Sequence, residues 1–230
     1  MNHPVGQGGP TSRPNSGPDI EFMRVDEDLL VVEKPAGMLC VPGRGPLAFD
    51  ALSLRVQRSY PDALIVHRLD MATSGLVLMA RGQTIQRALS AAFEQRRVDK
   101  LYVAVVAGLI EADAGVIDLP LAADWEHRPV QAVDHVRGKR SITHFRVLDR
   151  DEIAYTTRLE LRSLTGRTHQ LRVHLLALGH PIVGDALYAP ATSPTKAPAM
   201  AMRLMLHASR LALAHPRDAS RIEVASTVPF

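Results

Sequence analysis

The stretch of this 230-residue chain with the clearest chemical potential is VHRLDMATSGLVLMA, residues 66–80. Asp70 lies between two apolar runs, in a turn where Thr73 and Ser74 add hydroxyl groups and Gly75 permits a positive φ. A carboxylate in such a turn can face a cleft and, when ionised, act covalently. It can equally cap the amides of the turn. The pattern alone favours neither interpretation.

Arg172 is the second candidate, in the segment RTHQLRVHLLAL, residues 167–178, whose spacing predicts a helix. At about 100° per residue, Arg172 lies between two apolar arcs formed by Leu171, Leu175 and Leu178 and by Val173 and Leu176. Because an unpaired buried charge is costly, we expect Arg172 to have an anionic partner or to bind an anionic ligand. The alternative is that its side chain reaches the surface along its apolar stem.

Tyr102 is the third candidate, since only 4% of the residues are aromatic. In the short β-branched segment KLYVAVVAG it shares a predicted strand face with Ala104 and Val106. A tyrosine among small residues can form one wall of a slot for a planar ring. A half-buried core tyrosine is the commoner case.

Other chemistries are excluded by spacing. His169 and His174 are five residues apart, which does not match a His-x-x-x-His zinc pair, and Cys40 is the only cysteine. The chain has no G-x-x-x-x-G-K-[ST] loop, no G-x-G-x-x-G sequence and no G-x-S-x-G elbow. We therefore expect no metal and no cofactor.

The composition suits a polyanionic partner, because 23 of the 27 basic residues are arginines and the net charge is +3. A high-GC genome would explain the same bias. Residues 1–18 lack the apolar core of a signal peptide, and no apolar run approaches the roughly 20 residues of a membrane span. We expect a soluble, cytoplasmic protein that does not contact a membrane.

The order of the predicted elements indicates an α+β fold. Residues 1–18 are rich in Gly, Pro, Ser and Asn and are expected to form a disordered tail. Strands are predicted at 29–32, 101–107, 153–162 and 203–214, and helices at 51–60, 84–97 and 167–178, with a Pro/Ala/Thr-rich loop at 189–199. Many strands with few, scattered helices favour a mixed, mostly antiparallel sheet.

Five motifs together resemble the RluA family of pseudouridine synthases. HRLDMATSG matches the family's H-R-L-D-x-x-T-S-G motif at every fixed position, and LTGRTHQLRVHLLALGHPIVGDALY matches its G-R-[ST]-H-Q-[IL]-R-x-H helix and the following turn. EKPAGMLCVPG, KLYVAVVAG and RLMLHASRLALAHP are similar to three further family segments. The motifs are in the family's order and span Asp26 to Pro216. The resemblance is closest to short members that act on both a tRNA anticodon stem-loop and a large-subunit rRNA hairpin.

The resemblance implies a pseudouridine synthase catalytic domain over residues 19–230, with flanking helices and loops and a central cleft. Longer members carry an N-terminal S4 domain, and the residues before Ile20 are too few and too polar to form one. RNA is the implied partner, no cofactor is needed, and the protein is expected to be a monomer.

The resemblance also assigns roles to individual residues. Asp70 would be the nucleophile, Tyr102 would stack on the target uracil, and Arg172 would pair with Asp70. Arg68 would fill the space that the flipped nucleotide leaves in the RNA stack. Further substrate contacts are expected from residues in the matched motifs: His67, Thr73, Arg167, His169 and a leucine of RLMLHA, Leu206 rather than Leu204.

The implied reaction breaks the N1–C1′ bond of a flipped-out uridine, turns the base and rejoins it through C5. Attack at C1′, attack at C6 and a glycal route are all compatible with the sequence. Two other functions are compatible with parts of it. A non-catalytic RNA binder on the same scaffold would explain the arginines, and a retaining glycosidase would need a second carboxylate about 5–5.5 Å away, for which the motifs offered no candidate.

Overall fold

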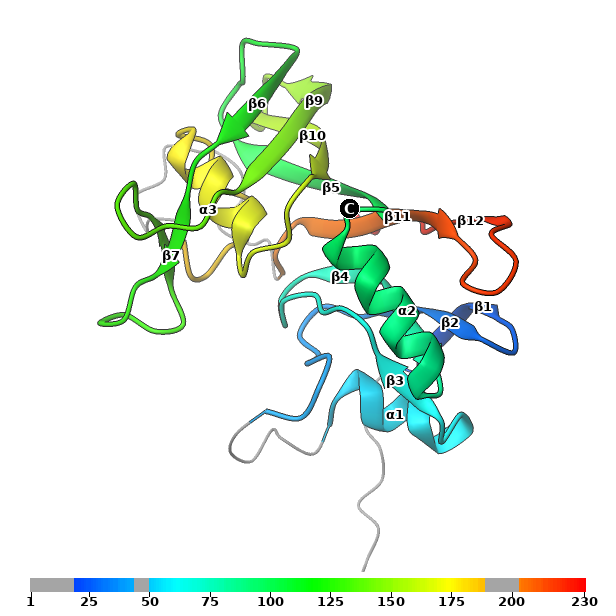
Figure 1. Ribbon diagram of the computed structural model, residues 1–230. Coiled ribbons are helices and arrows are strands. Elements are labelled where there is room, and N and C mark those ends of the chain that lie inside the picture. Colours follow the sequence, from blue (N-terminus) through cyan, green and yellow to red (C-terminus); the bar gives the residue numbers. More distant parts are fainter. Residues whose placement is uncertain (1–18, 44–49, 189–202) are drawn as a thin grey trace, which may run out of the picture.

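The computed structural model describes residues 19–43, 50–188 and 203–230, and the predicted tail and the 189–199 loop lie outside these ranges. Figure 1 shows the arrangement of the elements. Within the described ranges no helix is both long and apolar enough to span a bilayer. The three helices of these ranges are α1 (Leu52–Ser59), α2 (Gln83–Glu94) and α3 (Gln170–Ala177). The strands are β1 (Glu21–Val25), β2 (Leu29–Lys34), β3 (Ala63–Ile65), β4 (Ser74–Arg81), β5 (Asp99–Ala107), β6 (Ala114–Asp118), β7 (Leu121–Ala123), β8 (Gln131–Val133), β9 (Ile142–Asp151), β10 (Thr156–Ser163), β11 (Leu206–Ala214) and β12 (Arg221–Ala225).

Ten of these strands form one mixed sheet, which confirms the predicted fold class. Its order is β1-β2-β4-β11-β5-β10-β9-β6, with β12 added to β11 and β3 added to β4, while β7 and β8 form a separate hairpin. All pairings in the sheet are antiparallel except β4 with β11, where Ser74 faces His207 and Gly75 faces Ala208. Gly75 has φ 113°, as its sequence context predicted, and a Cβ there would lie 2.4 Å from the carbonyl oxygen of Ala208.

Three apolar clusters hold the helices against the sheet. Alternate residues of β2 divide between two of them: Leu29 and Val31 pack with α2, and Leu30 and Val32 pack with α1. Because successive strand residues point to opposite faces, α1 and α2 cover opposite faces of the sheet. The third cluster joins α3 to β5 and β10. Tyr102 packs against both the α1 and the α3 clusters, so these two helices lie on the same face, with Tyr102 where the clusters meet.

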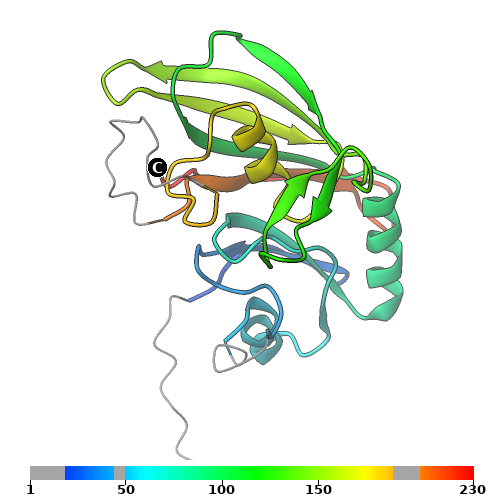
Figure 2. The ribbon, with the colours of Figure 1, turned by 90° about the vertical axis from the view of Figure 1, so that its left-hand side faces the viewer.

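Figure 2 shows the same division from the side. α3 and the β7–β8 hairpin lie above the segment that joins β3 to β4, and α1 lies below it. The Asp70 motif is therefore between two packed bodies of the molecule, held at its end by the start of β4.

The sequence patterns misplaced the start of three elements: the strand predicted at 203–214 begins only at Leu206, and two others differ as follows. The alternation at 153–162 predicted one strand, but Ile153 and Tyr155 belong to the β9–β10 turn, where Ile153 is 91% exposed and Tyr155 has φ 54°. The predicted helix 167–178 begins only at Gln170, because the Gln170 side chain accepts hydrogen bonds from the Arg167 amide and the Thr165 hydroxyl and so holds a non-helical turn before α3.

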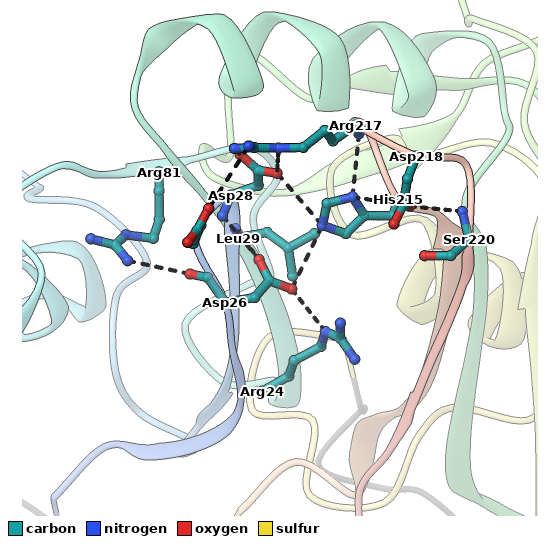
Figure 3. A network of polar contacts seen from close by, with 10 residues as sticks. Arg24, Asp26, Asp28, Leu29, Arg81, His215, Arg217, Asp218 and Ser220 are labelled. Carbon is teal, nitrogen blue, oxygen red and sulfur yellow. Dashed lines mark hydrogen bonds and ion pairs between the residues drawn. The ribbon is translucent and has the colours of Figure 1, made fainter.

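Two turns at one end of the sheet are tied together by charged groups (Figure 3). Arg217, after β11, forms a bidentate ion pair with the buried Asp28, which lies before β2. His215 Nε2 lies 3.7 Å from carboxylate oxygens of both Asp26 and Asp28. The Arg217 guanidinium holds the pKa of Asp28 below its usual value despite burial. This network fixes the β1–β2 edge to the C-terminal hairpin.

Candidate active site

The turn that carries Asp70 is anchored by a buried lysine. Lys34, fully buried at the end of β2, donates hydrogen bonds to the carbonyls of Pro35 (2.8 Å), Met38 (2.9 Å) and Met71 (3.1 Å). The three donors of its ammonium are thereby used. Burial lowers the pKa of Lys34 to about 8, while the charge of Asp70 acts in the opposite direction. Through Lys34, the backbone of Met71, the residue after Asp70, is therefore held to the segment between β2 and α1.

The charge of Asp70 faces a buried guanidinium. The side chain of Asp70 is 25% exposed, and its carboxylate lies 3.8 Å from Arg172 Nη1 and 3.9 Å from His169 Nε2. Arg172 itself forms two short hydrogen bonds to Asp185, at 2.8 and 2.7 Å. The prediction that Arg172 is buried and has an anionic partner is confirmed, but its direct partner is Asp185, with Asp70 in a longer ion pair.

Asp185 and Asp70 together determine the state of the guanidinium. Burial on its own would lower the pKa of Arg172, but the hydrogen bonds to Asp185 and the charges of Asp185 and Asp70 raise it. Asp185 also accepts hydrogen bonds from the amides of Leu187 and Tyr188, which fixes its position. Arg172 is thus a permanently charged, immobile cation beside a carboxylate that retains access to solvent.

A pocket of about 360 Å³ opens beside this pair. Its lining comes from the Asp70 turn, the hairpin loop, α3 and the segment after α3: Asp70, Met71, Ala72, Pro129, His169, Arg172, Gly184, Asp185, Ala186, Leu187 and Leu204. The lining is mostly apolar, with the charged groups gathered at one side. Pockets of this size bind small planar or ring-shaped ligands.

Tyr102 contributes a neutral phenol to the same region. Burial and, to a smaller extent, the negative charge of Asp70 raise the pKa of Tyr102 to about 12, so the two side chains are close enough to interact. The phenol is therefore not a base near neutral pH. Its ring is available as an apolar surface where the α1 and α3 clusters meet.

His169 and Tyr188 frame the other side of the pair. His169 Nδ1 is 2.7 Å from the Tyr188 hydroxyl, and the Tyr188 ring lies under the Arg172 guanidinium at 4.9 Å. Burial lowers the pKa of His169, with Asp70 opposing and Arg172 adding to the effect. A neutral His169 adds no second positive charge beside Arg172.

The chain as a whole is similar to known enzymes. The chain is 48% identical to the dual-specificity RNA pseudouridine synthase RluA of Yersinia pestis over 191 residues, which cover 83% of this chain and 90% of that protein. It is 46% identical to the protein of the same name in Escherichia coli K12, covering 88% and 90% of the two chains. A model of the RNA pseudouridylate synthase family matches residues 28–177. This chain belongs to the RluA family of RNA pseudouridine synthases.

A solved structure agrees with this assignment. Human RNA pseudouridylate synthase domain containing 1 is 31% identical, with a TM-score of 0.78 over 95% of this chain and 87% of its own. The protein is thus an RNA pseudouridine synthase, an isomerase whose partner is RNA.

The remaining predicted residues of this synthase occupy varied positions. Arg68 and Arg167 are exposed, in the turns before Asp70 and before α3. Thr73 is buried, and its hydroxyl has no hydrogen-bond partner among the described residues. His67 does not line the pocket: its ring stacks on Phe93 with centroids 4.5 Å apart, and its Nε2 accepts a hydrogen bond from the Leu78 amide. Burial lowers the pKa of His67 to about 3.

The sequence analysis expected Leu206 rather than Leu204 to contact the substrate, and the structure favours Leu204. Leu204, not Leu206, lines the pocket. Leu206 is the first residue of β11, opposite Ala104 of β5, and its side chain is buried in the α3 cluster. Leu204 precedes the strand, which leaves its side chain facing the cavity.

Sequence reasoning missed Lys34 and Asp185. Asp185 was a detectable candidate, since it follows the apolar Ile182–Val183 pair in the turn after α3, and a carboxylate in that context needs a cation as much as Arg172 needs an anion. The view that the motifs offered no second acid was therefore wrong. Lys34 ends an otherwise apolar strand, which is the corresponding signal for a buried ammonium.

Metal ligands do not gather near this site. Across residues 19–43, 50–188 and 203–230, no group of three or more His, Cys, Asp or Glu side chains is placed to hold a metal ion.

Proposed function

We propose that this synthase converts uridine 746 of 23S rRNA and uridine 32 of tRNA to pseudouridine, with Asp70 as the nucleophile. The two relatives described above carry the name dual-specificity synthase, and the matched motifs cover most of this chain. The observation that carries the catalytic part is the position of Asp70: a partly exposed carboxylate, 3.8 Å from a fixed guanidinium, at the wall of a nucleoside-sized pocket.

The pocket chemistry fits each step of the isomerisation. Arg172 places a fixed positive charge 3.8 Å from the Asp70 carboxylate, and the ionised carboxylate is the form that can act as a nucleophile. The N1–C1′ bond breaks, the uracil turns against the apolar wall to which Leu204 contributes, and a C5–C1′ bond forms. C5 loses its proton to solvent and N1 takes one up, so the reaction is a net isomerisation. The bond that Asp70 forms to the nucleoside breaks again before the product leaves, which returns the free carboxylate for the next turnover.

Asp185 is not positioned to act as a second catalytic acid. Its side chain is 1% exposed, both oxygens are bonded to Arg172, and two backbone amides complete its shell. A retaining glycosidase needs a second carboxyl group that can exchange a proton with the leaving group. The geometry of the pocket therefore supports isomerisation over glycoside hydrolysis.

The surface beside the site carries cations that no described carboxylate neutralises. Arg68, Arg96, Arg97, Lys100 and Arg167 have no acidic partner among the described side chains. By contrast, other strand arginines are ion-paired, as Arg146 is with Glu160 and Arg210 with Glu223. Free guanidinium and ammonium groups are the usual contacts of RNA phosphates.

These five cations belong to one region. Lys100 Nζ lies 5.5 Å from the centre of the Phe93 ring, which stacks on His67, the neighbour of Arg68. The same ammonium lies 3.8 Å from the point where a Cβ on Gly166 would stand, next to Arg167. Arg96 and Arg97 follow directly after α2, so the end of this helix, the Asp70 turn and the start of α3 form a common basic border.

The identity of the targets is tested by mapping pseudouridine with carbodiimide chemistry in RNA from a deletion strain. We expect the signals at uridine 746 of 23S rRNA and uridine 32 of tRNA to disappear and to return with the plasmid-borne wild-type gene. An unchanged map would reject both targets, and loss of a single signal would reject dual specificity.

A non-catalytic RNA binder is the alternative that shares most of these features. Release of tritium from C5-labelled uridine in each RNA distinguishes the two functions, because binding alone releases none. Stoichiometric release from the target uridine is expected for the purified protein.

A further inference from the structure

We propose that Trp125 is a base-stacking residue that holds an unpaired nucleotide next to the target uridine; this rests on the proposed function. Trp125 is the only tryptophan of the chain, and it is 67% exposed at the tip of the β7–β8 hairpin. A large aromatic side chain left in solvent is unfavourable for a monomer and is typical of a binding surface. Figure 1 shows β7 of this hairpin beside α3, and Pro129 of the hairpin loop lines the pocket.

Trp125 lies close to the pocket. It belongs to the loop of residues 124–130, which a hydrogen bond from the Asp124 amide to the Val130 carbonyl, 3.0 Å, closes at its base. Pro129 of the same loop lines the pocket that also contains Asp70. The guanidinium of Arg128, the residue before Pro129, contacts the indole, so the indole stands at the pocket border, within reach of a nucleotide adjacent to one bound inside.

Contacts within the loop and with its neighbours fix the position of the indole. The Arg128 guanidinium lies over one face of the ring, 3.6 Å from its centre, which leaves the other face for a ligand. Asp124 accepts hydrogen bonds from the amides of Glu126 and His127, and this closes the loop into a defined turn. The base of the hairpin is held to α3, since the Gln131 amide donates to the Tyr188 hydroxyl, which also contacts His169.

The chemistry of the free face fits a nucleobase. Every base offers a planar π-surface, and an aromatic side chain that stacks on one contributes binding without selecting its identity. No carboxylate of the described residues pairs with Arg128, so its cation can meet a neighbouring phosphate while it supports the ring. A flipped uridine breaks the stacking of its neighbours, and Trp125 would replace one of those lost contacts.

The sole tryptophan makes the test direct, because its fluorescence reports only position 125. We would titrate the wild-type protein with a tRNA anticodon stem-loop carrying uridine 32, and with a perfectly paired RNA duplex of the same length. Base stacking quenches indole emission, so the stem-loop should quench strongly and the duplex weakly. Unchanged emission at saturating stem-loop, in a preparation that converts the same RNA, would overturn the proposal and leave the proposed function intact.

Variants separate stacking from fold. Trp125→Ala should weaken stem-loop binding by about 5- to 150-fold, Trp125→Phe by less, and each should change kcat little. Tyr155→Ala is the matched control, since Tyr155 is an exposed aromatic in the β9–β10 turn, and it should bind as the wild type does. Binding of Trp125→Ala within twofold of wild type would also overturn the proposal. Absence of tritium release with any RNA would instead contradict the proposed function.

Discussion

At the scale of single residues, the site depends on an arginine with two acidic neighbours of different kinds. Asp185 is buried and holds Arg172 through two hydrogen bonds, whereas Asp70 is partly exposed and interacts across 3.8 Å. The close pair gives the guanidinium a fixed position and charge. The distant carboxylate remains free to react. One cation thus serves the structure and, in the proposed mechanism, catalysis.

Asp185→Asn tests the structural half of this arrangement. We expect a loss of roughly 3 kcal/mol in the free energy of unfolding, because removing one partner of a buried ion pair leaves the other charge poorly compensated. Asp113→Asn is the control: Asp113 pairs with Arg150 but its side chain is 89% exposed, so the loss should stay below about 1 kcal/mol. Urea unfolding of both variants measures the difference, and equal losses would refute a structural role for Asp185.

The sequence predicted the need of Arg172 for an anion but not which anion. Helical spacing places the base of its side chain between apolar arcs. Because an unpaired buried charge is costly, a side chain in that position needs an anionic partner. Choosing between Asp70 and Asp185 requires knowing where two turns meet in space, which no local pattern encodes. The same holds for Leu204 and Leu206, two residues apart in a segment whose strand begins at the second of them.

At the scale of elements, the junction of β4 and β11 positions the Asp70 turn. The hydroxyl of Ser74, the first residue of β4, lies 2.8 Å from Nδ1 of the buried His207. It also accepts a hydrogen bond from the Arg203 guanidinium. Gly75 lets the two backbones approach, since any side chain there would meet Ala208. The only parallel pairing of the described sheet is thus located where the catalytic turn ends.

Gly75→Ala tests this close approach. Gly82 provides a matched control, because it also has a positive φ, 79°, but nothing lies within 4 Å of its Cβ position. Gly82→Ala should cost only the backbone strain, about 1–2 kcal/mol. Gly75→Ala should cost several kcal/mol more and reduce turnover, as measured by urea unfolding and tritium release. Similar losses for the two variants would show that the contact with Ala208 is unimportant.

Elements were predictable where their own residues decide them. The apolar strand at Leu29–Val32 and the β-branched strand around Tyr102 form as expected, as do α1 and α2 within a few residues. The early starts predicted for β10 and α3 failed because side chains of the preceding turns compete with regular structure. Tyr155 adopts a left-handed conformation, and Gln170 caps the loop before its own helix.

At the scale of the whole molecule, burial of imidazoles makes stability depend on pH. Burial lowers the pKa of His67 to about 3 and that of His207 to about 4, and it lowers the pKa of His169 and His174 as well. The unfolded chain therefore binds more protons than the folded chain below the ordinary histidine pKa. The free energy of unfolding should fall as pH drops below about 6.5, by about 1.4 kcal/mol per pH unit for each proton.

His207→Gln removes one of these groups. The pH dependence of its unfolding free energy between pH 6 and pH 5, where the carboxylates are still ionised, should be smaller than that of the wild type by the contribution of about one proton. Urea unfolding at several pH values gives both pH dependences. A wild-type stability that stays constant over this range would contradict the assignment of neutral buried histidines.

The cations without acidic partners beside the Asp70 turn predict that RNA phosphates bind at this border of the molecule rather than at its ion-paired arginines. The double variant Arg96→Gln, Arg97→Gln should lower the salt slope of stem-loop binding by about two, one for each lost phosphate contact. Arg146→Gln with Arg210→Gln removes the same charge from ion-paired positions and should leave the slope nearly unchanged. Equal effects of the two double variants would mean that the basic border beside Asp70 has no special role.

The order of the sheet was beyond sequence reasoning. β11 lies between β4 and β5 although residues 82–205 separate it from β4 and residues 108–205 from β5, and such pairings depend on the packing of three clusters at once. The class of fold followed from the number and kind of elements, and the roles of Asp70, Tyr102 and Arg172 entered through the motifs. Their proximity is a property of the complete sheet.

Single-turnover tritium release by Asp70→Asn, with stem-loop binding measured on the same preparation, tests the central claim most directly. Asparagine keeps the size of the side chain but removes the charge that faces Arg172. We expect C5 tritium release to become undetectable while the RNA dissociation constant stays within a few-fold of wild type. Release at a rate near that of the wild type would show that Asp70 is not the nucleophile.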